Sequence, residues 1–216
     1  MSKPRPPKHR DVQAATEPGH PAPEPRGAPE FPALAGCMTP PQEFARLCGE
    51  FGLSLEPLEI ERLGRYLWLL LETNKAHNLT AIRDEAEAWT RHIFDSLTLL
   101  PALGELSEGA RIIDVGSGGG LPGIPLAIAM PALRFTLLEA TGKKAAFLRH
   151  ALASLGLENA EVCSARAESA AREPGRRDGY DAAIARAVGP MAVIAELTTP
   201  FVKPGDRVTP DSVLCL

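Results

Sequence analysis

Short apolar runs alternate with amphipathic stretches along the second half of the chain. Four runs have the length and composition of buried strands, at residues 112–115, 135–139, 161–163 and 181–185. Apolar residues recur at helical spacing between and after them, which predicts helices over 121–130, 145–155 and 191–202. Strands alternating with helices favour an α/β fold with a doubly wound, mostly parallel sheet.

The first half of the chain has a helical pattern. Helices are predicted over 42–51 and 57–77, and the second carries an apolar stripe that includes Leu58, Leu63 and Leu67. Asp84 is the predicted N-cap of a further helix that runs to Leu100, followed by a linker over 101–109. We therefore expect one domain over 42–216, with a helical N-terminal part (42–109) and a ligand-binding α/β part (110–216).

Residues 1–41 have a different composition. They hold 11 of the 21 prolines and show no hydrophobic period, which predicts a disordered tail. Its basic start, residues 3–10, could touch an RNA phosphate backbone, or it is simply a solvated extension.

A glycine-rich turn joins the first predicted strand to its helix. The dinucleotide fingerprint G-x-G-x-x-G fails here, because its sixth position, counted from Gly116 as the first, is Leu121 rather than glycine. No Gly-Lys-Ser/Thr of a P-loop follows. What remains is Asp-x-Gly-x-Gly-x-Gly, formed by Asp114, Gly116, Gly118 and Gly120, which resembles the first motif of S-adenosylmethionine-dependent methyltransferases. The alternative is an ordinary strand-to-helix turn.

An acid follows the second predicted strand. Glu139 lies 19 residues after Gly120, close to the spacing of about 20 residues expected for a carboxylate that binds ribose hydroxyls. Asp114, the glycines and Glu139 fall at the carboxyl ends of strands, where doubly wound sheets bind their ligands.

Charge and cysteine usage narrow the function classes. The net charge of -4 gives no global affinity for nucleic acid, so RNA contacts would have to be local. Four scattered cysteines without a CxxC argue against a metal site or a disulfide framework and favour a reducing cytoplasm. The sequence shows no secretory signal and no apolar run of transmembrane length, so we expect no membrane contact.

Several blocks, in this order, resemble the bacterial small-subunit (16S) ribosomal RNA guanine-N7 methyltransferases, the RsmG or GidB family. The resemblance covers roughly residues 42–205, and its glycine motif is extended by Gly-Leu-Pro-Gly-Ile-Pro. The blocks are Asn-Lys-Ala-His-Asn-Leu-Thr at 74–80, Arg-His-Ile-Phe-Asp-Ser at 91–96, the glycine motif at 114–125, Leu-Glu-Ala-Thr-Gly-Lys-Lys at 138–144 with Phe-Leu-Arg at 147–149, Arg-Ala-Glu at 166–168 and Ala-Arg-Ala at 185–187.

The resemblance implies a class I, Rossmann-like methyltransferase that binds S-adenosyl-L-methionine. It places cofactor contacts at Gly116 and Leu121, at the Ala167–Glu168 pair and at Arg186, with Glu168 accepting from the adenine amine. The alternatives are a solvated helix cap for Glu168 and a surface ion pair for Arg186.

The resemblance also implies 16S ribosomal RNA or the small ribosomal subunit as partner, and we expect a monomer. RNA contacts are predicted at local cations, namely Lys75, Arg91, His92, Lys143 and Lys144. His92 is alternatively a structural histidine bonded to a backbone carbonyl. Guanine N7 attacks with an existing lone pair and needs no general base, so no catalytic residue is assigned.

The chain departs from the family at its end. Residues 203–205 resemble the turn before a fifth strand, but Pro210 would interrupt a central strand and the sequence stops at Leu216. We therefore expect the last strands to be missing. This leaves open a truncated, inactive cofactor-binding fragment, or a methyltransferase acting on a protein or a small molecule.

Overall fold

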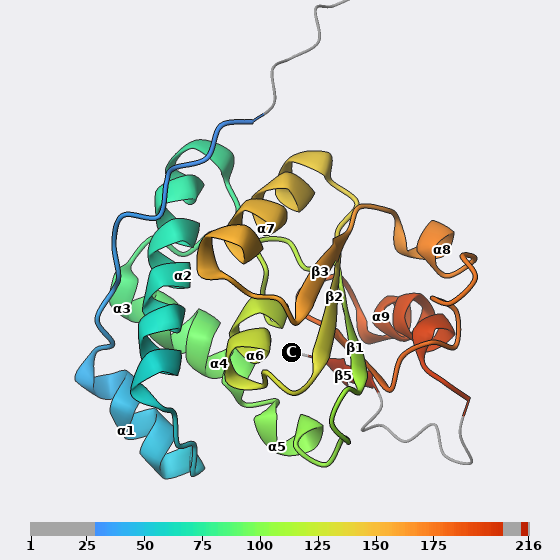
Figure 1. The fold of residues 1–216 in the computed structure, drawn as a ribbon, viewed down its shortest axis with the longest axis horizontal. Helices are drawn as coiled ribbons and strands as arrows, with labels where there is room; N and C mark the ends of the chain where they lie inside the picture. Colours follow the sequence, from blue (N-terminus) through green and yellow to red (C-terminus); the bar gives the residue numbers. More distant parts are fainter. Residues whose placement is uncertain (1–28, 205–212, 216) are drawn as a thin grey trace, which may run out of the picture.

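The computed structural model describes residues 29–204 and 213–215, and its centre is a five-stranded parallel sheet (Figure 1). The strand order is β3-β2-β1-β4-β5, so the order reverses between β1 and β4. The first four strands confirm the predicted ones to within one residue. The strands are β1 (Arg111–Val115), β2 (Arg134–Leu138), β3 (Ala160–Cys163), β4 (Ala182–Ala185) and β5 (Val213–Cys215).

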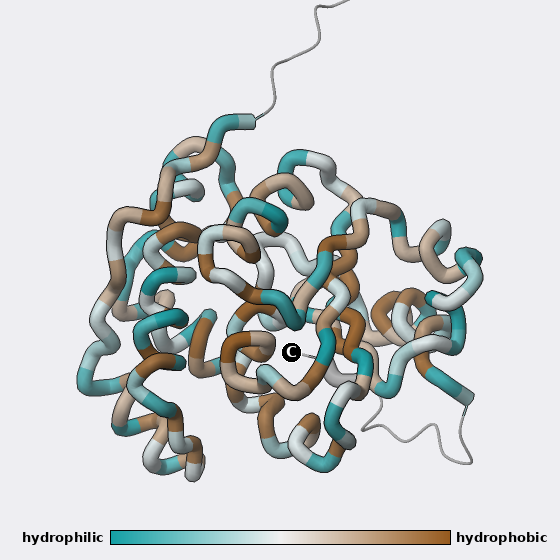
Figure 2. Tube along the Cα trace, in the orientation of Figure 1, coloured by the Kyte–Doolittle hydropathy of each residue, from teal (hydrophilic) through white to brown (hydrophobic). Residues whose placement is uncertain are grey.

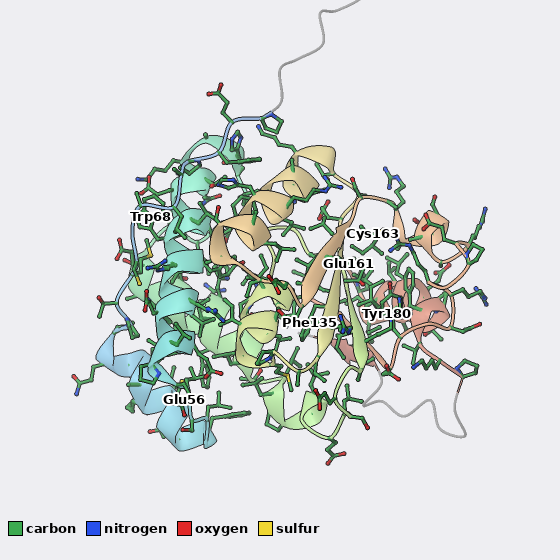
Figure 3. All side chains as sticks on the ribbon, viewed as in Figure 1. Glu56, Trp68, Phe135, Glu161, Cys163 and Tyr180 are labelled. Carbon is green, nitrogen blue, oxygen red and sulfur yellow. The ribbon has the colours of Figure 1, made fainter. Side chains whose placement is uncertain are left out.

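The strands β1, β2 and β4 are buried along most of their length, as expected for a parallel sheet covered on both faces. In β1, Ile113 and Val115 belong to the apolar cluster under α9, while Ile112 packs in a cluster with residues of α6. The helices α6 (Gly123–Ala129) and α7 (Gly142–Leu155) cover one face, and α9 (Met191–Thr198) covers the other. Figure 3 labels Phe135 beside α6 and Tyr180 near α9.

The predicted helix over 191–202 is too long. It ends at Thr198 and gives way to a 3₁₀ turn, η2 (Thr199–Phe201), because Pro200 lacks the N–H that would continue the helix. The helix after β2 begins three residues earlier than predicted, at Gly142 rather than residue 145. A one-turn helix that the sequence pattern did not predict, α8 (Ala167–Ala170), follows β3.

The N-terminal helices α1 (Gln42–Phe51) and α2 (Pro57–His77) match the prediction, and α2 packs over α6 and α7. Asp84 is an N-cap as expected, because its Oδ1 accepts a hydrogen bond from the Glu87 backbone N–H at 2.8 Å. The single helix predicted from there to Leu100 is wrong, and part of the predicted linker is helical. This stretch comprises α3 (Glu85–Ala88), the π-helix η1 (Trp89–Phe94), α4 (Asp95–Leu97) and α5 (Leu100–Leu103).

Residues 29–41, which belong to the predicted tail, run along the outer side of α2 (Figure 1). The ring of Phe31 stacks on His150 of α7 with 5.4 Å between the ring centroids, and the His150 ring is hydrogen-bonded to the Pro32 carbonyl at 2.9 Å. Gly36 lies against Trp68, the α2 residue labelled in Figure 3. Apolar anchors thus fix this part of a proline-rich segment; residues 1–28 lie outside the described part.

The three-residue β5 corrects the expectation for the fifth strand alone, because no further strand follows it among the described residues. β5 pairs in parallel with β4, with Ala183 opposite Val213 and Ala185 opposite Cys215. Pro210 lies outside the described residues and outside this strand. Figure 2 shows long hydrophobic stretches in the strands and in the helices beside them. Among the described residues, no helix combines the length and apolar character needed to cross a membrane.

Candidate active site

The glycine-rich loop between β1 and α6 has a backbone that needs glycine. Gly116, Gly118 and Gly120 all adopt positive φ, at 77°, 57° and 98°. A Cβ at Gly120 would also lie 2.5 Å from the Cδ1 of Ile124, so this position is required by helix packing as well as by conformation. Glycine at these positions lets the backbone turn sharply and lets a ligand approach it closely.

Glu139, at the end of β2, fixes the shape of this loop. Its Oε2 accepts a hydrogen bond from the Gly118 N–H at 2.9 Å, and its Oε1 accepts one from the Thr141 N–H at 2.7 Å. The residue is 7% exposed. Each carboxylate oxygen can accept more than one bond, so this arrangement leaves acceptor capacity for ribose hydroxyls.

Asp114 lies beneath the loop and is fully buried. Its Oδ2 accepts a hydrogen bond from the Gly123 N–H at the start of α6, at 3.0 Å. Within the described part of the chain its Oδ1 has no hydrogen-bond partner. Burial raises the pKa of this carboxyl to about 7, since removal from water disfavours the charged form.

Behind the loop stands α2. The buried hydroxyl of Tyr66 donates to the Gly119 carbonyl oxygen at 2.8 Å. A Cβ at Gly119 would come within 2.9 Å of the Cδ1 of Leu70. The helical N-terminal part therefore touches the loop directly.

A cavity of about 700 Å³ opens on the outer side of the loop. Four other parts of the chain complete its walls: the segment after α2, η1 with α4, the start of α7 and the end of β4. Its lining consists of Leu79, Thr80, Ala81, Ile82, Thr90, Arg91, His92, Asp95, Gly116, Ser117, Gly118, Gly119, Leu121, Lys144, Arg186 and Ala187. The cavity lies beyond the carboxyl ends of β1 and β4, at the reversal of strand order.

Arg186 ties the end of β4 to the π-helix. Its Nη1 donates to the Arg91 carbonyl oxygen at 3.1 Å and to the Oδ2 of Asp95 at 3.3 Å. Its Nη2 lies 3.3 Å from the Nδ1 of His92. The Arg186 side chain is 14% exposed, whereas its partner Asp95 is 47% exposed.

His92 is buried, and both of its ring nitrogens have partners. Nε2 lies 2.6 Å from the Oγ1 of Thr80, and Nδ1 faces the Arg186 guanidinium. Burial, and then the positive charge of Arg186, lower the pKa of this imidazole to about 4. His92 is therefore neutral at pH 7, and its ring nitrogens contact a hydroxyl and a guanidinium.

A second, smaller cavity of about 180 Å³ lies beside the first. Ala167 and Glu168, which follow β3, line it together with Gly116, and Gly116 also lines the larger cavity. A ligand that crosses Gly116 would thus meet the ends of β1, β3 and β4.

The structure divides the predicted cofactor residues into two groups. Those lining the cavities are Gly116, Gly118, Leu121, Ala167, Glu168 and Arg186. The others, Asp114, Gly120 and Glu139, hold the loop from behind. Their contacts with a cofactor stay predictions.

The predicted RNA-binding residues divide in the same way. Arg91, His92 and Lys144 line the large cavity. Lys75 forms an ion pair with Glu72 at 2.5 Å and lines a separate pocket, while Lys143 is exposed outside the cavities. The RNA contacts of all five residues stay predictions.

Sequence reasoning did not single out Thr80, Asp95 or Ser117, all of which line the large cavity. Thr80 and Asp95 belong to the two blocks that were recognised as motifs, so the signal was present without an assigned role. Within residues 29–204 and 213–215, no cluster of three or more His, Cys, Asp or Glu could hold a metal ion.

Comparison with known proteins was made against families, curated relatives and solved structures. The family model for rRNA small subunit methyltransferase G (GidB) matches residues 59–209. The chain is 51% identical over 174 residues to the ribosomal RNA small subunit methyltransferase G of Sorangium cellulosum, covering 79% of this chain and 71% of that protein. It is 44% identical over 165 residues to the protein of the same name from Roseiflexus castenholzii, covering 76% and 70%.

A solved structure shows the same fold at low identity. A putative O-methyltransferase from Klebsiella pneumoniae matches with a TM-score of 0.52 and 18% identity, covering 76% of this chain and 68% of that one. The fold is thus α/β and Rossmann-like, of the type found in methyltransferases. On the family match and the identities to its members, the chain belongs to the rRNA small subunit methyltransferase G family.

Proposed function

We propose that this chain transfers the methyl group of S-adenosyl-L-methionine to N7 of a guanine in 16S ribosomal RNA, acting as a cytoplasmic monomer on the RNA or on the small ribosomal subunit. One observation carries the proposal. The loop with the methyltransferase glycine motif forms a wall of the same cavity as Arg91 and Lys144, two cations that can meet a phosphate backbone.

The carboxylates and the glycine backbone around the two cavities suit this cofactor. Glu168 presents a carboxylate in the small cavity, which suits the adenine amine, and Glu139 keeps acceptor capacity for the ribose. The unpartnered Oδ1 of Asp114 and the positive-φ glycines suit the amino-acid end, where a ligand must approach the backbone closely. When bound, the cofactor supplies a methyl group on a positively charged sulfur.

The remaining chemistry needs little from the protein. Guanine N7 carries a lone pair and loses no proton, so the chain must align the base with the methyl group and exclude water. His92 fits such a site poorly as a base, because both of its nitrogens are engaged in hydrogen bonds. Arg186 and Asp95 are likewise paired with each other, which gives the cavity a fixed polar wall.

The RNA would be held by local cations. Because the whole chain carries a net charge of -4, attraction to RNA has to come from a confined surface. Lys144, at the start of α7, and Arg91, on η1, lie on different sides of the cavity. They can therefore bind phosphates on either side of one inserted nucleotide.

The test is a methylation assay with a radiolabelled methyl donor, offered separately to bare 16S RNA, to small ribosomal subunits and to a protein extract. We expect label in RNA, and 7-methylguanine after its digestion. Label that appears only in protein or in a small molecule would show that the chain acts on another substrate. Folded protein that shows no heat of binding with S-adenosylhomocysteine would indicate an inactive fragment.

A matched pair of variants tests the cofactor site by titration calorimetry. Glu168→Ala should weaken S-adenosylhomocysteine binding by about tenfold, the loss of one hydrogen bond to a charged group. Glu158→Ala removes an exposed carboxylate just before β3, at the opposite end of the sheet, and should leave the affinity unchanged. Equal S-adenosylhomocysteine affinities in the two variants would show that Glu168 does not contact the cofactor.

A further inference from the structure

The bonds around His92 fix which of its nitrogens carries the proton. A guanidinium has donors and no acceptor, so the Nδ1 that faces the Nη2 of Arg186 at 3.3 Å must accept. The opposite form would set an N–H against the guanidinium N–H. A neutral imidazole therefore holds its proton on Nε2.

That proton determines the state of Thr80. The Nε2–H of His92 donates to the Thr80 Oγ1 at 2.6 Å, and the Ile82 backbone N–H donates to the same oxygen at 3.1 Å. A hydroxyl has two lone pairs and one proton, so both acceptor sites are used. Its remaining capacity is to donate.

The position of Thr80 is equally constrained. Its backbone N–H donates to the Oδ1 of Asn74 at 2.9 Å, and Asn74 is itself buried at 3% exposure. Thr80 lines the large cavity, and among the residues that the structure describes no acceptor is recorded for its hydroxyl proton. The Thr80 hydroxyl is therefore a hydrogen-bond donor on the wall of the cavity that the glycine loop also lines.

We propose that Thr80 selects guanine over adenine by donating its hydroxyl proton to O6 of the base whose N7 is methylated. This inference rests on the proposed function and adds to it a residue that reads the base. Guanine presents two neighbouring acceptors, N7 and O6, whereas adenine presents N7 beside an amino donor. A fixed donor pairs with guanine, and against adenine it leaves two donors facing each other without a partner.

Arg186 and His92 are positioning residues in this scheme. They touch neither base nor methyl group, and they act by holding the Thr80 oxygen in its accepting role. The guanidinium of Arg186 has donors and no acceptor, so it keeps the Nδ1 of His92 in its accepting role. No covalent step is added to the reaction.

The experiment compares two bases at the methylated position. The substrate is the small-subunit RNA carrying there either guanosine or 2,6-diaminopurine riboside, which keeps N7 and the 2-amino group but has an amine in place of O6. We measure kcat/KM on both for the full-length wild type, Thr80→Val and Thr80→Ser. The control is Thr199→Val, at an exposed threonine whose hydroxyl donates to the Ala195 carbonyl oxygen of the preceding α9.

We expect the wild type, Thr80→Ser and Thr199→Val to prefer guanine by at least about tenfold, which corresponds to about 1.4 kcal/mol. In Thr80→Val the preference should fall below about threefold, with S-adenosylhomocysteine affinity unchanged. A Thr80→Val enzyme that keeps the wild-type preference overturns the inference, and so does a Thr80→Ser enzyme that loses it.

A wild-type measurement keeps the inference testable if Thr80→Val fails to fold. In protein labelled with ¹⁵N at histidine, His92 should show a protonated Nε2 and an unprotonated Nδ1 from pH 5 to pH 8. The opposite tautomer overturns the inference. The two failures are distinguishable: a wild type that methylates no RNA sinks the proposed function, whereas one that methylates both bases equally sinks only the role of Thr80.

Discussion

The hydroxyl of Tyr66 donates to the backbone carbonyl of Gly119 across 2.8 Å, joining α2 to the glycine loop. The two residues are 53 positions apart in the chain, and the bond is buried. It shows that the helical N-terminal part supports the loop from behind, so the two parts form one working unit. A loop carbonyl in this position would otherwise be buried without a partner.

Removal of this hydroxyl should destabilise the fold. We expect Tyr66→Phe to lower the free energy of unfolding by about 1–3 kcal/mol, because the Gly119 carbonyl loses its partner. Tyr180→Phe is the matched control: Tyr180 is also fully buried, but its hydroxyl has no recorded partner in the described structure, so its loss should be neutral or stabilising. Urea denaturation measures both, and equal losses would contradict the assignment.

Gly123 should not tolerate a side chain. A Cβ there would meet the Cδ2 of Leu137 and lie 2.6 Å from the Oδ2 of Asp114. We expect Gly123→Ala to destabilise the protein by about 1–3 kcal/mol through overpacking at the start of α6. Gly49→Ala, in an exposed turn of α1 with open space around it, should instead stabilise by up to about 1 kcal/mol. Thermal unfolding of both variants measures these changes in stability. A Gly123→Ala variant as stable as the wild type would show that α6 can shift.

The pH dependence of stability should contain two opposing contributions. Asp114 has a folded pKa of about 7, above its ordinary value near 3.9, so its contribution is lost as pH rises through 7. His92 has a folded pKa of about 4, below its ordinary value near 6.5, so its contribution is lost as pH falls through 4. Between pH 4 and 6.5, a rise in pH lowers the free energy of unfolding through Asp114 and raises it through His92.

Asp114→Asn isolates the first slope. The difference in unfolding free energy between wild type and variant should change by on the order of 1 kcal/mol per pH unit between pH 4 and 7, with the wild type losing relative stability as pH rises. The other titrating groups occur in both proteins and cancel in the difference. Urea titrations at five pH values measure it, and a flat difference would show that Asp114 is charged in the folded protein.

Neutralising a cavity lysine should weaken RNA binding without affecting the cofactor. Lys144→Gln should reduce RNA affinity and lower the slope of log K against log salt by about 1, the loss of one phosphate contact. Lys143→Gln should have a smaller effect, because Lys143 lies outside the cavity. The combined reversal of both charges should reduce RNA binding further while sparing S-adenosylhomocysteine.

The control for this series is Lys203→Gln. Lys203 pairs with Asp181, which precedes β4 and therefore lies at the amino end of the sheet, away from the cavity. RNA affinity and salt slope should match those of the wild type. Loss of RNA and cofactor binding together in the Lys144 variant would mean that its fold, rather than its charge, had changed.

The strands and the long helices could be predicted because each buries an apolar face of constant period. β1 and α2 are examples, since local residue type and periodicity were sufficient for both. The π-helix over Trp89–Phe94 could not be predicted from periodicity, and it contains Arg91 and His92, which contact Arg186 about 95 residues away in the sequence. Periodicity describes one segment and carries no information about such partners.

In the candidate site, too, some residues could be predicted from the sequence and others could not. Gly116 was found from the glycine turn that follows a strand, and Glu168 from the family resemblance. The structure places both at cavities. The hydroxyl of Thr80 was missed because its importance comes from two donors that converge on it, one of them from twelve residues away. Likewise, Phe31 was assigned to a tail because its partners His77 and His150 lie on two separate helices.

Glu139 bonds to Gly118 and Thr141, and Asp114 and Tyr66 support the same loop, so the chain's own contacts fix its shape. A cradle that is rigid beforehand loses little conformational entropy when it is filled, so more of the contact energy remains as affinity. Its association should need no slow rearrangement, and the cofactor and its demethylated product should enter and leave at rates set by diffusion and contacts rather than by reordering of the loop.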